Sequence, residues 1–187
     1  MIEQYKLQIK KLMSEKRFVH SVSVAREAVK LAKIYGVDSN KAEISGLLHD
    51  VTKDMSKDDQ LQIVRCFGII MTDIEFRSAK LWHAITAPVY LEKIFGIKDR
   101  DILNAVRYHT TGRACMSKLE KIIFVADSIS EDRKYSGVEK LRKKAYVSLE
   151  EAMLIGINFT LNELTNKKYL IAPDTIFAYN EIMMKFI

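Results

Sequence analysis

The sequence predicts an all-α protein, and three observations lead to this prediction. Among 187 residues there are only 7 glycines and 2 prolines, so residues that interrupt helices are scarce. Apolar residues recur at helical spacing in several segments, and no segment alternates apolar and polar residues as a half-buried strand does. The length suits one core, and no linker is visible, so we expect residues 1–187 to form a single domain.

The first expected helix covers residues 17–35, and Gly36 ends it as a C′ glycine would. Its apolar stripe consists of Phe18, Val22, Ala25, Val29 and Ala32. Asn40 followed three residues later by Glu43 resembles a capping box. This pair predicts the start of a second helix that continues to about residue 51.

Further helices are expected over residues 57–66, 78–95, 101–108, 117–129, 138–165 and 174–187. Pro88 lies inside one of these patterns and predicts a kink or a split there. The last segment is rich in apolar residues, which suit either core packing or a contact in a homodimer; core packing is the simpler interpretation. These residues are Ile182, Met183, Met184, Phe186 and Ile187.

Charge and cysteine content narrow the class of protein. The net charge is +6, but no aromatic-rich basic stripe or nucleic-acid motif accompanies it, so no nucleic-acid partner is expected. A basic surface also suits attraction of a polyanionic small molecule. Cys66 and Cys115 are too few for a disulfide framework, and each is expected to be a small buried residue. No signal peptide or membrane-spanning run is visible, so we expect a cytoplasmic protein without a membrane partner.

All four histidines belong to one ordered set that also contains two aspartates. Imidazole nitrogens and carboxylate oxygens together are ligands for a divalent metal, and they do not distinguish iron from manganese or zinc. Six such groups are enough for two metals that share a bridging ligand. The set is His20, His49, Asp50, His83, His109 and Asp127.

Taken singly, these residues also have simpler interpretations. His20 and His83 stand among apolar neighbours, as a buried histidine with one hydrogen bond would. Asp127 interrupts an apolar helix, where a carboxylate is costly unless it is paired or metal-bound. His49 and Asp50 are adjacent on a predicted helix, so their side chains diverge by about 100°. They can reach one metal, or Asp50 can bridge two.

Polar residues near this set suggest a phosphate-binding side. Lys53 lies four residues after His49, on the same face of the predicted helix. Thr111 and Arg113 follow the last histidine and offer a hydroxyl and a guanidinium to a phosphate. The simpler interpretation of this loop is a helix terminus. Asp54 is expected to be a solvated carboxylate.

These motifs together resemble the HD-domain superfamily of metal-dependent phosphohydrolases. Within it, the sequence is similar to the YqeK-type branch, the symmetrical bis(5′-nucleosyl)-tetraphosphatases. The resemblance extends from Arg17 to Asn180. The matching stretches are RFVHSVSVAREAVKLAKIYGVD, AEISGLLHDVTKD, HAITAP, HTTGRACMSKLEKIIFVADSISEDRKYSGVEKLR and IAPDTIFAYN.

The resemblance implies a helical bundle and assigns roles to the polar set. One metal would be held by His20, His49, Asp50 and Asp127, and a second by His83, His109 and the bridging Asp50. The metal would be iron, with manganese as the alternative. Catalytic roles would belong to His49, Asp50, Lys53 and Asp127, and Asp127 would also orient or deprotonate the water. Substrate contacts would come from Lys53, His83, His109, Thr111, Arg113 and Arg133.

Two short departures from that branch are visible. The branch often has proline and glycine where Ala114–Cys115 stand here, and again where Glu131–Asp132 stand. Both replacements lie in expected loops, and all six expected metal ligands are kept. The departures therefore affect loop rigidity and nucleotide fit more than metal binding.

The resemblance implies hydrolysis of dinucleoside polyphosphates by a metal-activated water, with diadenosine tetraphosphate cleaved symmetrically into two ADP. Three alternatives remain open. The chain can act on another nucleotide, such as a deoxynucleotide, guanosine tetraphosphate or a cyclic nucleotide. It can be a nucleotide-binding module without turnover, or a structural helical domain in which the histidines are incidental.

Overall fold

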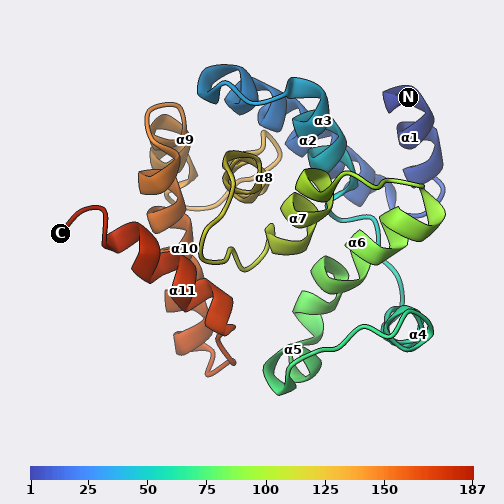
Figure 1. The fold of residues 1–187 in the computed structure, drawn as a ribbon. Helices are drawn as coiled ribbons and strands as arrows, with labels where there is room; N and C mark the ends of the chain where they lie inside the picture. The colour runs from blue at the N-terminus through green and yellow to red at the C-terminus, as the bar shows by residue number, and fades with distance from the viewer.

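The computed structural model describes residues 1–187, and its regular elements are all helices, so the all-α prediction is confirmed (Figure 1). Its elements are α1 (Ile2–Ile9), α2 (Glu15–Tyr35), α3 (Ser39–Leu48), α4 (Lys57–Cys66), α5 (Asp73–Arg77), the 3-10 turn η1 (Ala79–Leu81), α6 (Trp82–Ile94), α7 (Arg100–Tyr108), α8 (Lys118–Ile129), α9 (Val138–Ala145), α10 (Leu149–Asn166) and α11 (Pro173–Met183). None of these helices combines the length and the apolar character needed to cross a bilayer.

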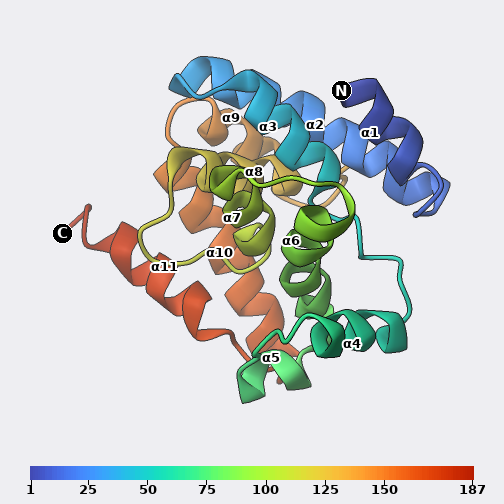
Figure 2. The same ribbon diagram turned by 45° about the vertical axis from the view of Figure 1, so that its right-hand side comes forward.

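Helix α8 is the central element of the bundle. Nine of its twelve residues are buried, and α2, α3, α7, α9 and α10 pack around it (Figures 1 and 2). A helix that is apolar on nearly all sides is stable only inside a protein, which explains this position. The hydroxyl of Ser117 and the carboxylate of Glu120 form a capping box that fixes where α8 begins.

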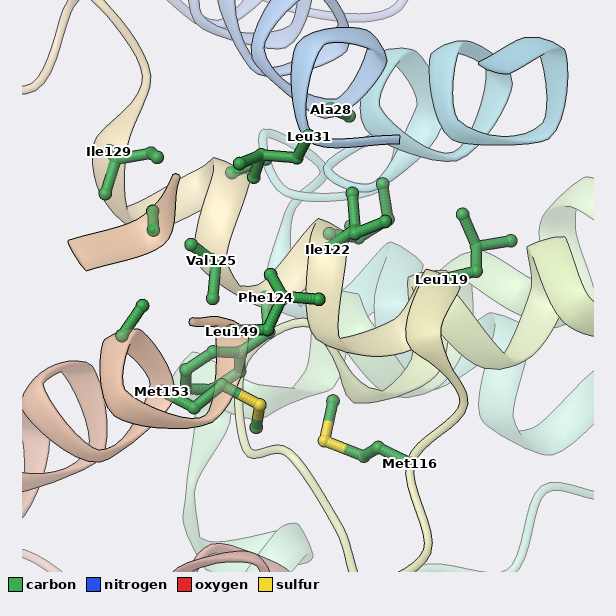
Figure 3. Packing of buried hydrophobic residues seen from close by; sticks show 14 of the residues in the cluster. Ala28, Leu31, Met116, Leu119, Ile122, Phe124, Val125, Ile129, Leu149 and Met153 are labelled. Carbon is green, nitrogen blue, oxygen red and sulfur yellow. The ribbon is translucent and has the colours of Figure 1, made fainter. Parts of the chain in front are cut away.

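Two hydrophobic clusters fill the interior. The larger one surrounds α8 and includes Ile122, Phe124, Val125 and Met153 (Figure 3). The smaller one lies among α1, α3, α6 and α7. Helices α2, α3 and α7 contribute residues to both clusters, so they form the partition between them. The polar residues of the candidate site lie on and beside this partition.

Gly46 allows α2 and α3 to pack backbone against backbone. A Cβ atom at this glycine would lie 2.8 Å from Ala25 Cα and 3.0 Å from Ala25 N, closer than real Cβ atoms approach. The absence of a side chain therefore sets the distance between the two helices. One consequence is that the rings of His20 on α2 and His49 at the end of α3 have centroids only 5.3 Å apart.

The boundaries of α3 differ from the expected ones. The Asn40–Glu43 capping box was wrong, because the carboxylate of Asp38 caps the helix and accepts hydrogen bonds from the backbone of Asn40 at 2.8 Å and Lys41 at 3.2 Å. The helix ends at Leu48 rather than residue 51, and turns follow it. Asp50 and Lys53 therefore lie in a turn and not on a helix face.

Other segments also differ from expectation. Of the kink or split expected at Pro88, the split is absent, because α6 runs through Pro88, and η1 precedes this helix. The single helix expected over residues 138–165 is divided into α9 and α10, because Ser148 accepts a hydrogen bond from Glu151 N and starts a new helix. Helices α1 and α5 were not predicted. Cys66 and Cys115 are exposed, so the prediction that they are buried was wrong.

The close approach at Gly46 gives a prediction for stability. We expect Gly46→Ala to lower the free energy of unfolding by about 1–3 kcal/mol, the typical cost of forcing extra atoms into a packed core. Gly156→Ala is the matched control, because its added Cβ would meet nothing closer than Phe124 Cε1 at 3.5 Å. That control should gain up to about 1 kcal/mol from better helix propensity. Equal urea midpoints for the two variants would contradict the role assigned to Gly46.

Candidate metal centre

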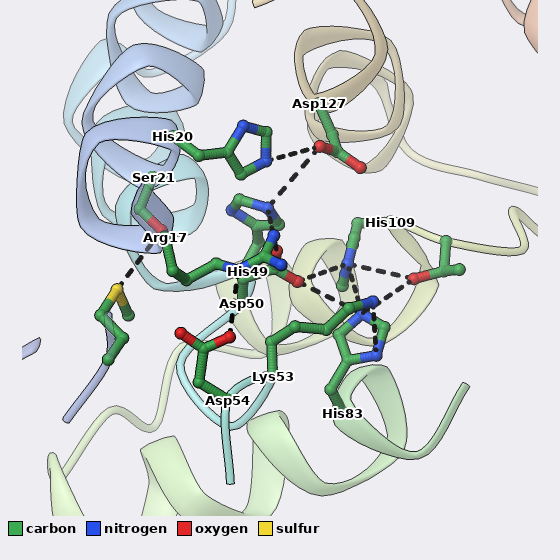
Figure 4. A network of polar contacts seen from close by, with 12 residues as sticks. Arg17, His20, Ser21, His49, Asp50, Lys53, Asp54, His83, His109 and Asp127 are labelled. Carbon is green, nitrogen blue, oxygen red and sulfur yellow. Dashed lines mark hydrogen bonds and ion pairs between the residues drawn. The ribbon is translucent and has the colours of Figure 1, made fainter. Parts of the chain in front are cut away.

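Six polar side chains from five helices converge inside the bundle (Figure 4). The structure thus brings together every residue that the sequence placed in the metal set. Four imidazoles and one carboxylate are buried, and Asp127 is partly exposed. The contributing residues are His20 from α2, His49 and Asp50 from the end of α3, His83 from α6, His109 from the end of α7, and Asp127 from α8.

Two of the imidazoles are oriented by the helices that they terminate. His49 is the C-cap of α3, and its Nδ1 lies 2.8 Å from the carbonyl oxygen of Gly46. His109 is the C-cap of α7, and its Nδ1 lies 2.6 Å from the carbonyl oxygen of Val106. A carbonyl can only accept, so Nδ1 carries a proton in both rings and Nε2 is the nitrogen available to a metal. In both cases Nε2 lies on the cluster side.

His49 provides the test of whether these residues fit a metal. Its Nε2 atom is buried and has no hydrogen-bond partner in the chain. A buried polar atom without a partner is costly, and native proteins rarely leave one unexplained. A divalent metal would give this atom a partner, and the Gly46 contact holds the ring in an orientation in which Nε2 can bind one.

Asp50 stands between two groups of imidazoles. Its Oδ1 lies 3.3 Å from His83 Nε2 and 3.5 Å from His109 Nε2. Its Oδ2 lies 3.4 Å from His49 Nε2 and accepts a hydrogen bond from Arg17 Nη1 at 2.6 Å. The two oxygens of one carboxylate therefore face two different sets of nitrogen donors, the arrangement that a bridging ligand requires.

Asp127 is paired on two sides, as a carboxylate in an apolar helix must be. Its Oδ1 lies 2.9 Å from His20 Nε2 and 3.8 Å from His49 Nε2. Arg133 contacts the same carboxylate through Nη2 and donates from Nε to the backbone carbonyl of Asp127 at 2.8 Å. The other nitrogen of His20, Nδ1, lies 2.8 Å from Asp132 Oδ2.

The donor atoms form three overlapping groups, and within each group all atoms lie within 4.8 Å of one another. One group contains His20, His49 and Asp50, and another contains Asp50, His83 and His109. These two groups share only Asp50. The third group, His49, His109 and Asp127, crosses between them. The chemistry of the donors, nitrogen and carboxylate oxygen, suits a divalent transition metal.

The electrostatics of the cluster keep its carboxylates ionised. Burial alone would raise the pKa of Asp50, but the nearby imidazoles, His49 first and then His109, outweigh it and hold that pKa well below its usual value. Burial also opposes ionisation of Asp127, yet His20 and Arg133 keep its pKa well below the ordinary range. Both aspartates therefore carry the charge that a metal ligand needs.

Lys53 lies beside the cluster. Its Nζ atom is 3.0 Å from both ring nitrogens of His83, which places the ammonium against the face of the ring. Burial, followed by the ammonium of Lys53, holds the pKa of His83 well below its usual value, so this imidazole is neutral. Thr52 fixes the turn by donating a hydrogen bond to the carbonyl oxygen of His83 at 3.0 Å. The turn after α3 and the first turn of α6 are thus held together.

The expected substrate residues after His109 have partners in their own loop. Thr111 donates to the carbonyl oxygen of Gly112 at 2.8 Å. Arg113 donates from Nε to Glu120 at 2.8 Å, and its guanidinium lies over the ring of Tyr108. The hydroxyl nearest the cluster belongs instead to Thr110, whose Oγ1 is 3.0 Å from His109 Nε2. Lys53 and Arg133 lie at the cluster, whereas Thr111 and Arg113 lie beside it.

Several contacts at the cluster were not predicted from the sequence. Arg17 contacts Asp50, and its Nε lies 3.5 Å from Asp54 Oδ1. Asp54 is exposed, as expected of a solvated carboxylate, and it also accepts hydrogen bonds from Ser14 N at 2.9 Å and Ser14 Oγ at 2.7 Å. Arg17 precedes His20 by three residues on α2, a helical spacing that could have indicated its position.

The fold and the cluster define a class of protein: an all-α bundle with a buried set of imidazoles and carboxylates beside cationic side chains. The chain belongs to the HD domain family, which matches residues 17–132. The resemblance stated from the sequence is therefore confirmed.

Three relatives make the placement more specific. The chain is 38% identical to a symmetrical bis(5′-nucleosyl)-tetraphosphatase of Halalkalibacterium halodurans, over 95% of this chain and 94% of the relative. It is 37% identical to the protein of the same name from Bacillus subtilis, over 92% of each chain. The crystal structure of a predicted HD superfamily hydrolase involved in NAD metabolism, from Clostridium acetobutylicum, superposes with a TM-score of 0.95 at 36% identity and covers 99% of this chain and 98% of that one.

The position of Asp50 gives a prediction for metal content. Asp50→Asn removes the charge shared by the two donor groups while keeping the shape of the side chain. We expect the purified variant to lose most of its divalent metal by elemental analysis, with an unchanged helical circular dichroism spectrum. Asp58→Asn, an exposed position in the first turn of α4, is the control and should keep the wild-type content. Full metal content in Asp50→Asn would contradict the bridging assignment.

Proposed function

We propose that this chain is a metal-dependent phosphohydrolase that cleaves dinucleoside tetraphosphates symmetrically, so that diadenosine tetraphosphate yields two ADP. The observation that carries the proposal is Asp50, buried between two groups of imidazoles with cationic side chains beside it. The relatives named for this activity, which are similar over more than nine-tenths of the chain, support the choice of substrate.

The proposed metal ligands follow the two groups that share Asp50. His20, His49, Asp50 and Asp127 would hold one metal, and His83 and His109, with Asp50, would hold a second. Iron is the proposed metal and manganese the alternative. Nitrogen and carboxylate donors suit both ions, so the support for iron comes from the resemblance of the sequence.

The reaction joins a water oxygen to one β-phosphorus and breaks the anhydride bond in the middle of the tetraphosphate. The second β-phosphate then leaves as part of ADP. A bound divalent metal lowers the pKa of water from about 16 toward about 7 and offsets phosphate charge. Asp127, which is ionised and contacts His20 at the cluster, would accept a hydrogen bond from the water and orient it.

The cations of the chain would bind and neutralise the phosphates. Lys53 holds its ammonium at the face of His83, and Arg133 reaches the cluster from the loop after α8. Fixed cations of this kind stabilise negative charge that develops on a phosphate. Thr111 and Arg113 remain proposed substrate residues, because the bond to Glu120 uses only Nε and leaves the Nη donors of Arg113 available. His83 and His109 would line the substrate at the same place.

Further proposals concern the state of the protein. Residues 1–187 would act as one domain, since the two hydrophobic clusters share α2, α3 and α7. We propose a cytoplasmic enzyme with a nucleotide substrate and no nucleic-acid partner. Some C-terminal apolar residues pack in the core and others are free for a dimer contact. Ile182 is buried, whereas Phe186 is 53% and Ile187 100% exposed. The exposed part supports a homodimer contact, which sedimentation of the purified protein would test.

Product analysis tests the proposed function. The protein would be incubated with diadenosine tetraphosphate under anaerobic Fe²⁺ and separately under Mn²⁺, and the nucleotides separated. We expect ADP as the single product. ATP plus AMP would contradict symmetrical cleavage. A larger kcat/KM for a deoxynucleotide, guanosine tetraphosphate or a cyclic nucleotide would favour the alternative substrates, and metal-loaded protein without turnover would favour a binding module.

Lys53 provides a second prediction. Lys53→Ala removes one fixed cation from the cluster, and we expect kcat/KM to fall by about 10²- to 10³-fold, as when one transition-state donor is removed. Lys57→Ala is the control, because Lys57 is an exposed lysine in the next helix. It should leave kcat/KM unchanged. A Lys53→Ala enzyme with wild-type kcat/KM would exclude the proposed phosphate contact.

A further inference from the structure

His20 differs from the other histidines of the cluster in how its ring can be oriented. His49 and His109 terminate helices and donate from Nδ1 to a carbonyl of their own last turn. His20 lies inside α2, which runs from Glu15 to Tyr35, and the carbonyls around it are used by the helix itself. A partner for its Nδ1 therefore has to come from another part of the chain.

That partner is Asp132. Its Oδ2 lies 2.8 Å from His20 Nδ1, across 112 residues of sequence, and His20 is only 4% exposed. We propose that Asp132 is a positioning residue, which fixes the ring of His20 so that Nε2 faces the metal cluster. This inference rests on the proposed metal centre and adds a residue that supports it without touching metal or substrate.

The loop that carries Asp132 is anchored on both sides. Before Asp132, the backbone N–H of Glu131 donates to Ser23 Oγ of α2 at 3.0 Å. Arg142 of α9 donates to the carbonyl oxygen of Ser130, before Asp132, at 2.8 Å and to that of Arg133, after it, at 3.0 Å. These bonds hold the backbone of the loop against α2 and α9. Asp132 itself is exposed, and this fixed backbone presents its carboxylate to His20.

The chemistry of the pair has a defined consequence. Both ring nitrogens of His20 face carboxylates, Nδ1 facing Asp132 and Nε2 facing Asp127. Asp132 keeps a proton on Nδ1, so a metal that takes the place of the Nε2 proton would bind through Nε2. The negative charge also makes the imidazole a stronger donor. Loss of such a partner typically weakens metal binding by about 10- to 100-fold. The effect is on metal affinity, and it differs from a general loss of stability.

The test measures metal affinity and stability in the same variants. Metal-free wild type, Asp132→Ala, Asp132→Asn and Glu131→Ala would be titrated with Mn²⁺, with free Mn²⁺ followed by electron paramagnetic resonance. Urea unfolding of the metal-free proteins would run beside it. Glu131→Ala is the matched control, because it removes the same charge from the adjacent residue. Glu131 bonds to Ser23 through its backbone N–H, and the substitution leaves that bond intact.

We expect Asp132→Ala to raise the Kd for Mn²⁺ by about 10- to 100-fold. In urea, metal-free Asp132→Ala should be as stable as metal-free Glu131→Ala. Asp132→Asn keeps an acceptor oxygen and should recover part of the affinity. In zinc-loaded protein, nitrogen-15 spectra should show His20 protonated at Nδ1, with that proton signal shifted upfield or lost in Asp132→Ala.

The proposal would be overturned by a Kd of Asp132→Ala for Mn²⁺ within threefold of the wild-type Kd, or by an equal rise in Kd for Glu131→Ala. It would also be overturned if Asp132→Asn bound Mn²⁺ no more tightly than Asp132→Ala and its His20 Nδ1 proton signal matched that of wild type. Wild-type protein that binds no Mn²⁺ would be a different failure. It would overturn the metal centre and the proposed function with it. Normal binding by wild type and by Asp132→Ala would overturn the role of Asp132 alone.

Discussion

Asp50 is 3% exposed and lies among three imidazoles and one guanidinium, so its negative charge has to be offset by what surrounds it. An isolated buried carboxylate would be protonated or would destabilise the fold. Here the neighbouring groups keep its pKa well below the usual value, and its two oxygens face different donors. The other residues of the site are arranged around this one charge. Their proposed roles depend on it.

The fold meets that requirement with ordinary structural elements. Two helices end where an imidazole is needed, and the free carbonyls of their last turns set its tautomer. Gly46 lets α3 approach α2 closely enough for His49 to meet His20. The central helix α8 brings Asp127 to the same place, with Arg133 following in the next loop. The candidate metal site thus lies where the two hydrophobic clusters share their helices.

Local patterns in the sequence predicted the helical class, the family and the six residues that converge. Helix boundaries were predicted less well. Asp38 and Asn40 stand close together, and it is the local backbone geometry that makes Asp38 the cap of α3. The break between α9 and α10 contains neither glycine nor proline, so only Ser148 signalled it. The exposure of both cysteines depends on tertiary packing, which no local pattern records.

The supporting contacts of the site could not be predicted for a related reason. Asp54 binds Ser14 across 40 residues and Asp132 binds His20 across 112, and both pairs exist only because the helices pack as they do. Asp132 also stands in one of the two places where the chain departs from the branch that it resembles, so the resemblance did not point to it. The sequence identified the six residues that converge, and the structure was needed to identify the contacts that orient them.

The central claim is that Asp50 joins two metals held by two groups of imidazoles. The most direct measurement is a crystal structure of the Mn²⁺-loaded protein with anomalous data collected near the manganese absorption edge. The account predicts two anomalous peaks, one beside His83 and His109 and one beside His20 and His49, with Asp50 in contact with both. A map without a peak at this cluster, or with peaks that do not contact Asp50, would contradict it.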